Sequence, residues 1–237
     1  MFSFKGFITT EKNTHLEHLE DDIINRGSEG GKNAVNFLKS VRNMLAGSSS
    51  GRVNMSVKWD GAPAIICGIN PENGKFFVGT KSVFNKTPKI NYTPADISKN
   101  HSGPVAIKLN ACLRDLKRLG IRGIYQGDLL FTKGDLKPAV IDGEKMITFT
   151  PNTITYAVPM NSKLGRQIAR ARLGIVFHTY YTGKNMQSLT AGFGTIKGSG
   201  GSSAVYLASA GYTDTSGSST FTSGELSRFD ALIRMAE

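Results

Sequence analysis

Residues 58–79 read KWDGAPAIICGINPENGKFFVG and contain two short apolar runs separated by a loop of strong turn formers. The runs are Ala64 to Ile69 and Lys75 to Val78, and the loop between them is Asn70 to Gly74. Apolar runs of this length that are bounded by Asn, Pro and Gly are typical of β-strands. The stretch therefore predicts a β-hairpin that follows directly after a tight Asp60-Gly61 turn.

The rest of the chain alternates between helical and extended patterns. Apolar positions recur at helical spacing in five segments: one that starts at a Thr14–Glu17 capping box, Asn33 to Leu45, Pro104 to Leu119, Asn161 to Leu173, and Ser227 to Ala236. Besides the hairpin, strands are predicted in four segments: Val53 to Lys58, Gly123 to Phe131, around Ile147 to Val158, and Gly174 to Tyr181. We therefore expect an α+β fold with antiparallel sheets flanked by helices.

The charge of the chain points to an anionic partner. Lys and Arg number 29 against 18 Asp and Glu, which gives a net charge of +11 and a pI near 9.7. Such an excess attracts polyanions whatever their sequence, so nucleic acid is an expected partner. A basic surface that serves only solubility is the alternative, and the charge alone does not separate the two.

Two further features bear on location. Cys67 and Cys112 each lie in an apolar run and are too few for a disulfide framework or a zinc site, so we expect buried free thiols and a reducing, cytoplasmic setting. No stretch approaches the roughly 20 apolar residues of a membrane span, and the N-terminus has no secretory signal pattern. We expect no membrane partner; the sequence leaves the oligomeric state open, and a monomer is assumed.

Four short motifs follow one another in a recognisable order: Lys58-Trp59-Asp60-Gly61, Gly79-Thr80-Lys81-Ser82, Tyr125-Gln126-Gly127-Asp128-Leu129-Leu130, and Ile175-Val176-Phe177-His178-Thr179-Tyr180. In this order and spacing the chain resembles the covalent nucleotidyltransferase superfamily, which comprises ATP-dependent DNA and RNA ligases and mRNA-capping guanylyltransferases. The resemblance covers about residues 53 to 183.

The resemblance implies a role for each motif. Lys58 is the expected nucleophile, which attacks the nucleotide α-phosphate and holds the nucleotide as a phosphoramide. Lys81 is the expected phosphate-side cation, and Asp128 is expected at the ribose or as a ligand of Mg²⁺. Phe177 is expected to stack on the base, with His178 in the place where ligases carry Asp. Val57, Asp60 and Gly61 complete the expected nucleotide-binding set.

Elementary chemistry agrees with these roles. A lysine amine must be neutral to attack, and burial or a nearby cation favours the neutral form. Charge on a phosphoryl group in transit is stabilised by cations and Mg²⁺. We therefore expect the side chains of Lys58, Lys81, Asp128 and Phe177 to converge on one nucleotide cleft.

The implied function is ATP-dependent adenylyl transfer to Lys58 and then to a nucleic acid with a 5′-phosphate end. The basic helix that carries Arg166 and Arg170 is expected to face the nucleic acid. A capping-type enzyme that uses GTP is one alternative. A non-catalytic nucleic-acid-binding or structural protein that keeps the fold is the other, and the sequence does not choose between DNA and RNA.

Three segments are expected along the chain: a helical segment at 1–50, a nucleotidyltransferase core at 51–190, and a Gly/Ser/Thr-rich segment with a terminal helix at 191–237. Two downstream elements of the superfamily have no match in this sequence, namely an acidic metal-binding strand and a Lys-x-Lys strand. We therefore expect residues 191–237 to be an incomplete domain, and the 237-residue chain alone to adenylylate slowly or not at all.

Overall fold

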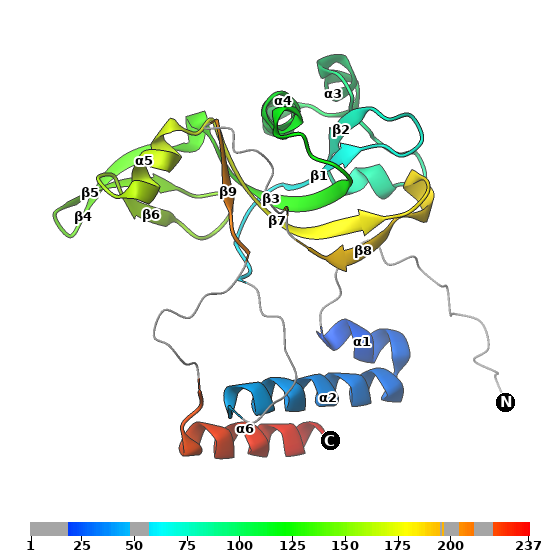
Figure 1. Ribbon diagram of the computed structural model, residues 1–237, viewed down its shortest axis with the longest axis vertical. Coiled ribbons are helices and arrows are strands. Elements are labelled where there is room, and N and C mark those ends of the chain that lie inside the picture. The colour runs from blue at the N-terminus through cyan, green and yellow to red at the C-terminus, as the bar shows by residue number, and fades with distance from the viewer. Residues whose placement is uncertain (1–18, 48–56, 195, 197–203, 211–219) are drawn as a thin grey trace. The chain divides into compact units, whose positions relative to one another are not determined.

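A computed structural model describes residues 19–47, 57–194, 196, 204–210 and 220–237 of the chain (Figure 1). It shows an α+β protein with a mixed six-stranded sheet and a smaller antiparallel three-stranded sheet, which confirms the predicted fold class. The contacts divide the chain into two compact units. One unit contains residues 58–210, and the other contains helices from both ends of the chain. The helices within residues 19–47 and 220–237 therefore share a unit, whereas the sequence predicted three consecutive segments.

The larger sheet is built around the predicted hairpin. Its strands are β1 (Ala64–Ile69), β2 (Phe76–Gly79), β3 (Ile124–Thr132), β7 (Leu173–Thr182), β8 (Thr190–Phe193) and β9 (Val205–Ala208). The order is β2-β1-β3-β7-β8, and β9 pairs with β7 in parallel. The antiparallel pairing of β1 with β2 confirms the hairpin. The central strands β3 and β7 carry the third and fourth motifs side by side.

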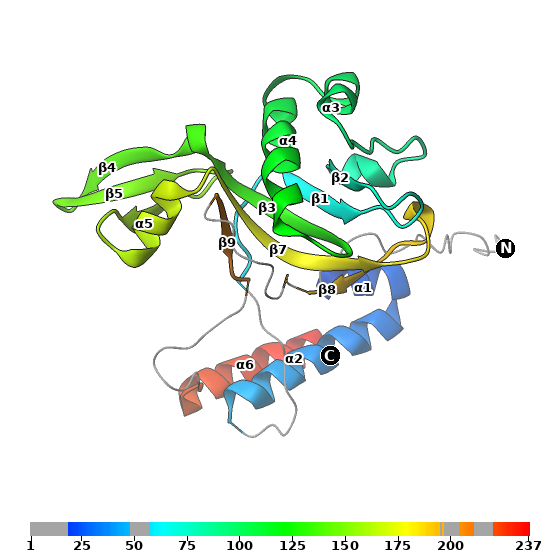
Figure 2. The same ribbon diagram turned by 45° about the horizontal axis from the view of Figure 1, so that its top comes forward.

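One face of this sheet is covered by α3 (Pro94–Asn100) and α4 (Gly103–Leu116), as Figures 1 and 2 show. Leu109 and Leu116 of α4 are fully buried with Ile65 of β1, and each such side chain contributes about 1.5–3 kcal/mol. Cys67 and Cys112 lie in the same cluster as free thiols, as expected, and burial raises the pKa of Cys112 to about 12.

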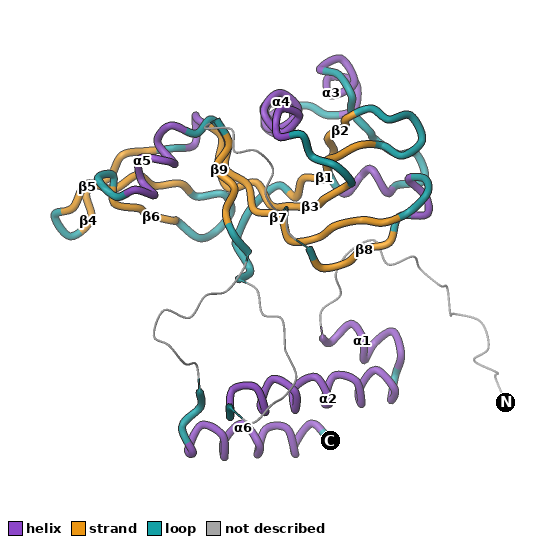
Figure 3. The backbone as a smooth tube through the Cα atoms, in the orientation of Figure 1, coloured by secondary structure: helices purple, strands orange, loops and turns teal. Residues whose placement is uncertain are grey.

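The opposite face carries two separate apolar clusters. In the first, Val83 of the 3₁₀ turn η1 (Lys81–Phe84) and Met186 of η4 (Met186–Ser188) pack on Ile66. The second joins the larger sheet to the smaller one, which consists of β4 (Lys137–Ile141), β5 (Glu144–Phe149) and β6 (Tyr156–Pro159) (Figure 3). Here Phe131 and Phe149 pack with Ile168 of α5 (Lys163–Arg170). The turns η2 (Lys117–Leu119) and η3 (Lys133–Asp135) complete this unit within the described residues.

A buried carboxylate ties α4 to the start of β7. Asp115 is buried, and its two oxygens lie 2.6 Å from the guanidinium nitrogens of Arg114 and Arg172. Burial opposes ionisation, but hydrogen bonds from both arginines lower the pKa of Asp115. The predicted helix at 161–173 therefore ends at Arg170, because Arg172 is held by Asp115 and Leu173 enters the sheet.

The second unit consists of α1 (Leu19–Arg26), α2 (Ser28–Leu45) and α6 (Ser223–Ala236). The helix α6 starts earlier than predicted because Thr222 and Glu225 form a capping box. The Arg42 guanidinium of α2 binds the Asp230 carboxylate of α6 at 2.8 Å. The predicted Thr14–Glu17 capping box and most of the Val53–Lys58 strand lie outside the described residues. No helix within the described ranges is long and apolar enough to cross a membrane.

Candidate functional site

The Lys58 loop lies directly against strand β3. A Cβ built on Gly61 would lie only 2.5 Å from the Cβ of Asp128, so the glycine backbone rests on that side chain. The next residue continues the contact, because the Ala62 N–H donates to the Leu129 carbonyl at 3.0 Å. The Leu129 N–H in turn donates to the Pro63 carbonyl at 3.2 Å. The first and third motifs, far apart in sequence, therefore meet at Asp128.

The Asp60 carboxylate anchors this loop to the β5–β6 connection. It accepts hydrogen bonds from Asn152 Nδ2 at 2.8 Å and from the Thr153 and Ile154 N–H groups at 2.7 Å each. The Asn152 amide and these two backbone donors lower the pKa of Asp60. Both oxygens are therefore engaged by the protein, which makes Asp60 a positioning residue for the loop in this structure.

Trp59 anchors the same loop through its ring. Its indole Nε1 donates to the Ser209 carbonyl at 3.0 Å, and its ring centroid lies 5.1 Å from that of Tyr156. The Tyr156 hydroxyl also accepts from the Asp60 N–H at 2.8 Å. The backbone beside Lys58 is thus fixed by polar and aromatic contacts, whereas Lys58 itself and Val57 are exposed. The lysine amine is accessible to a substrate.

A bulge in β7 places His178 beside Asp128. Gln126 of β3 pairs with Thr179, but the adjacent Gly127 pairs with Phe177, so His178 is an extra residue in β7. His178 Nε2 lies 3.4 Å from Asp128 Oδ2, and its Nδ1 lies 2.9 Å from Thr179 Oγ1. The Asp128 and His178 side chains are 22% and 26% exposed, so both remain reachable from solvent.

Asp128 and Phe177 lie on opposite faces of the sheet. Asp128 pairs with Ala64, which shares a face with Ile66 because side chains alternate along a strand. Ile66 belongs to the cluster on the face away from α4. Phe177, by contrast, is 3% exposed in the cluster beneath α4, with its ring 6.1 Å from that of Tyr125. The predicted stacking of Phe177 on a base is therefore wrong, since the ring is buried core.

One lysine supplies positive charge beside the loop, and a second lies on the face of the sheet that carries Asp128. Lys81 is exposed on η1, which covers the face that carries Asp128, so it lies on the expected side of the sheet. Lys108 of α4 places its Nζ 3.4 Å from the Ala62 carbonyl. Sequence reasoning missed Lys108 as a site residue, because it occupies an ordinary polar position of an amphipathic helix. Only the fold brings it to the loop that carries Lys58.

Arg166 and Arg170 lie on α5, which packs on the smaller sheet. Both side chains are exposed, and Arg166 donates to the Asn161 carbonyl within the first turn of the helix. Neither forms an ion pair with any residue in the described part of the chain. Neither guanidinium group therefore has an acidic partner among the described residues.

The described residues contain no group of three His, Cys, Asp or Glu side chains that could hold a metal ion by themselves. Asp128 is the carboxylate that the Lys58 loop contacts. Mg²⁺ commonly binds through one or two carboxylates together with substrate phosphates and water. The donor set thus fits a magnesium ion that arrives with a nucleotide, with Asp128 as the protein ligand.

The anchoring of the loop by Asp60 predicts a pH response. Because the pKa of Asp60 is lowered in the folded protein, its contribution to stability is present above the unfolded pKa and is lost as the pH falls through the folded value. The Thr153 and Ile154 amide resonances should titrate together with a midpoint below that of an ordinary aspartate. Amide NMR from pH 6 downward measures this, and the transition should vanish in Asp60→Asn. A midpoint at or above the ordinary value would contradict the anchoring role.

Comparison with known proteins adds a family. Residues 13–237 match the family described as a family of unknown function (DUF6267), and the chain belongs to that family. No curated protein and no solved structure matches the chain.

Proposed function

We propose that this member of the family is a covalent nucleotidyltransferase of the ligase type, which uses ATP to adenylylate Lys58. The observation that carries the proposal is the contact between Gly61 and Asp128. Two motifs that resemble one enzyme superfamily in sequence order also meet in space, with an exposed lysine at the end of an anchored loop. A nucleophile and a carboxylate on adjoining segments are two of the groups that phosphoryl chemistry requires.

In the proposed first step the neutral Lys58 amine attacks the α-phosphorus of ATP. An N–P bond forms, the bond from this phosphorus to the bridging oxygen of the β-phosphate breaks, and pyrophosphate leaves with that electron pair. The amine loses its proton to solvent, and AMP remains on the lysine as a phosphoramide. Magnesium, when bound with the nucleotide, would neutralise phosphate charge.

Four residues of the chain have proposed roles in binding the nucleotide. Lys81 and Lys108 are the cations that would attract the phosphates electrostatically. Asp128, with His178 held against it, presents polar atoms on the cleft side of the sheet for the ribose or the metal. His178 takes the place beside the base that the superfamily pattern assigns to an aromatic residue, because Phe177 is turned into the core.

In the proposed second step a 5′-phosphate oxygen of a nucleic acid attacks the adenylyl phosphorus. The new P–O bond replaces the N–P bond, the electron pair returns to the Lys58 nitrogen, and this nitrogen takes a proton from solvent to become the free amine. The net charge of +11 and the unpaired Arg166 and Arg170 support a nucleic acid as the acceptor.

A pulse-chase experiment tests both steps. The protein is incubated for several hours with Mg²⁺ and α-labelled ATP, then freed of nucleotide and mixed with a 5′-phosphorylated oligonucleotide. We expect an acid-labile, alkali-stable label that moves to this oligonucleotide but not to its 5′-hydroxyl counterpart. Preferential labelling by GTP would move the chain to the capping branch. The absence of label with either nucleotide would favour a binding protein that keeps only the fold.

The contact at Gly61 gives a sharper prediction. Gly61→Ala places a methyl group within 2.5 Å of the Asp128 Cβ, so the loop must move away from β3. We expect a loss of about 1–3 kcal/mol in the free energy of unfolding and at least a tenfold slower labelling of Lys58. Gly134→Ala is the matched control, because a Cβ there meets nothing within 4 Å. Equal labelling rates in the two variants would contradict the proposed site.

A further inference from the structure

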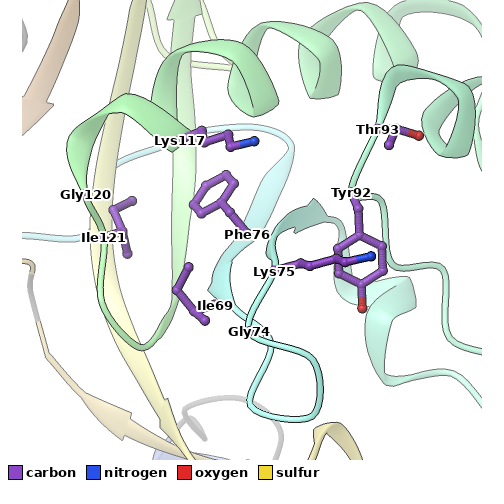
Figure 4. Close-up of a pocket in the computed structure, with 9 residues that line it drawn as sticks. All are labelled: Ile69, Gly74, Lys75, Phe76, Tyr92, Thr93, Lys117, Gly120 and Ile121. Carbon is purple, nitrogen blue, oxygen red and sulfur yellow. The ribbon is translucent and has the colours of Figure 1, made fainter.

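A pocket of about 470 Å³ lies at the far end of the β1–β2 hairpin from the Lys58 loop (Figure 4). It borders Ile69, the last residue of β1, whereas the Lys58 loop leads into Ala64, the first. The length of this strand separates the two places by about 17 Å. The pocket is therefore distinct from the candidate site, and its volume lies in the range of small-molecule sites.

The pocket has a rigid apolar wall. Phe76 and Ile121 are nearly fully buried members of the main core cluster, and Ile69 packs against the same cluster. Figure 4 shows these side chains on one side of the pocket, with Tyr92 and Thr93 on the other. Because this wall is part of the core, it presents a preformed surface to a ligand.

The aromatic wall is also fixed. The Tyr92 hydroxyl accepts hydrogen bonds from Asn70 Nδ2 at 2.7 Å and from Asn73 Nδ2 at 3.0 Å, and its ring meets Phe77 edge to face. These contacts hold the ring at the pocket, which the glycines Gly74 and Gly120 also line. A flat ring system would find an ordered aromatic neighbour here.

Two cations supply the polar part of the pocket. Lys75 and Lys117 both line it and are exposed, and no lining residue is acidic. Neither lysine has an ion-pair partner among the residues that the structure describes. The neighbouring Asp96 carboxylate is turned to two backbone N–H groups. It accepts hydrogen bonds from the Tyr92 N–H at 3.0 Å and from the Thr93 N–H at 2.9 Å. The lysine amines are left to bind an anion from solvent.

We propose that this pocket binds a nucleotide unit, with its base against Tyr92 and the apolar wall and its phosphate between Lys75 and Lys117. The ligand must combine a flat, largely apolar body with an anionic group, and a nucleotide has both. The excess positive charge of the chain further favours phosphate-bearing ligands. The unit is either a free mononucleotide or one residue of a nucleic acid strand. Nucleotide binding in this pocket does not depend on the adenylylation proposed at Lys58.

Amide NMR with AMP as the probe tests the proposal. We expect AMP to shift the Gly74 and Gly120 resonances in a saturable manner, while adenosine and inorganic phosphate at equal concentration do so far less. Lys75→Gln/Lys117→Gln should weaken AMP binding at these resonances by about tenfold. The control Lys99→Gln/Lys184→Gln removes the same charge from exposed positions outside the pocket and should change it less than twofold.

A second experiment distinguishes a free mononucleotide from a nucleic acid strand as the ligand of the pocket. A single-stranded octanucleotide that shifts the same glycine resonances at a lower concentration than AMP identifies a strand-binding site, and the reverse order identifies a mononucleotide site. Lys58→Arg should leave the shifts of the Gly74 and Gly120 resonances unchanged. A negative result for adenylylation of Lys58 can therefore be distinguished from a negative result for nucleotide binding in the pocket. The proposal is overturned if AMP and the oligonucleotide leave Gly74 and Gly120 unshifted, or if the two double variants weaken binding equally.

Discussion

Lys58→Arg is expected to abolish covalent labelling by ATP, with a loss of at least about a thousandfold in the single-turnover rate. Arginine keeps the positive charge and the length of the side chain, but its guanidinium stays protonated and cannot attack phosphorus. Because Lys58 is exposed and no described hydrogen bond depends on its amine, the fold should be unaffected. The rate is measured from alkali-stopped samples by intact mass.

A matched control makes this result specific. Lys86→Arg changes an exposed lysine in the same unit that no motif contains, and its labelling should equal that of the unchanged protein. Labelling that persists in Lys58→Arg at the unchanged rate would show that another residue is the nucleophile.

Substitutions at the neighbouring residues Phe177 and His178 are expected to differ strongly in their effect on the stability of the fold. Phe177→Ala removes a buried ring from the cluster beneath α4 and should cost about 3–5 kcal/mol in the free energy of unfolding. His178→Ala removes a partly exposed ring on the other face and should change stability by less than about 1 kcal/mol. Urea denaturation monitored by circular dichroism measures both values.

Nucleotide binding should separate changes at the same two residues in the reverse sense. His178→Ala is expected to weaken binding of an ATP analogue with a non-cleavable α–β bridge by about 1–3 kcal/mol, the usual contribution of one ring beside a base. Phe177→Leu, which keeps most of the buried apolar volume, should bind the analogue as well as the unchanged protein. If Phe177→Leu weakened binding and His178→Ala did not, the assignment of the two faces would be wrong.

The sequence predicted the elements whose local signals are strong. The β1–β2 hairpin follows from two apolar runs around Asn70 to Gly74, and α4 follows from one broad apolar stripe. The helix α3 and the strand β8 were missed, because they are short and depend on neighbours for their stability. The grouping of α2 with α6 was also missed, since contacts between distant segments leave no local pattern.

The candidate site was predictable only in part. Motif order pointed to Lys58 and Asp128, and the structure brings the Lys58 loop to Asp128 through Gly61. The face of Phe177 was not predictable, because an extra residue in β7 inverts the alternation at the bulge. Lys108 was equally hidden, since its partner is a backbone carbonyl that only the tertiary fold brings near.

The site on Lys58 is tested most directly by mapping the nucleotide adduct. The unchanged protein is incubated with Mg²⁺ and ATP until its intact mass stops changing, digested at alkaline pH, and analysed by tandem mass spectrometry. We expect AMP to accumulate slowly to one per chain, bound to the Lys58 side chain, with no adduct on Lys81 or Lys108. No adduct after prolonged incubation, or an adduct on any residue other than Lys58, would contradict this expectation.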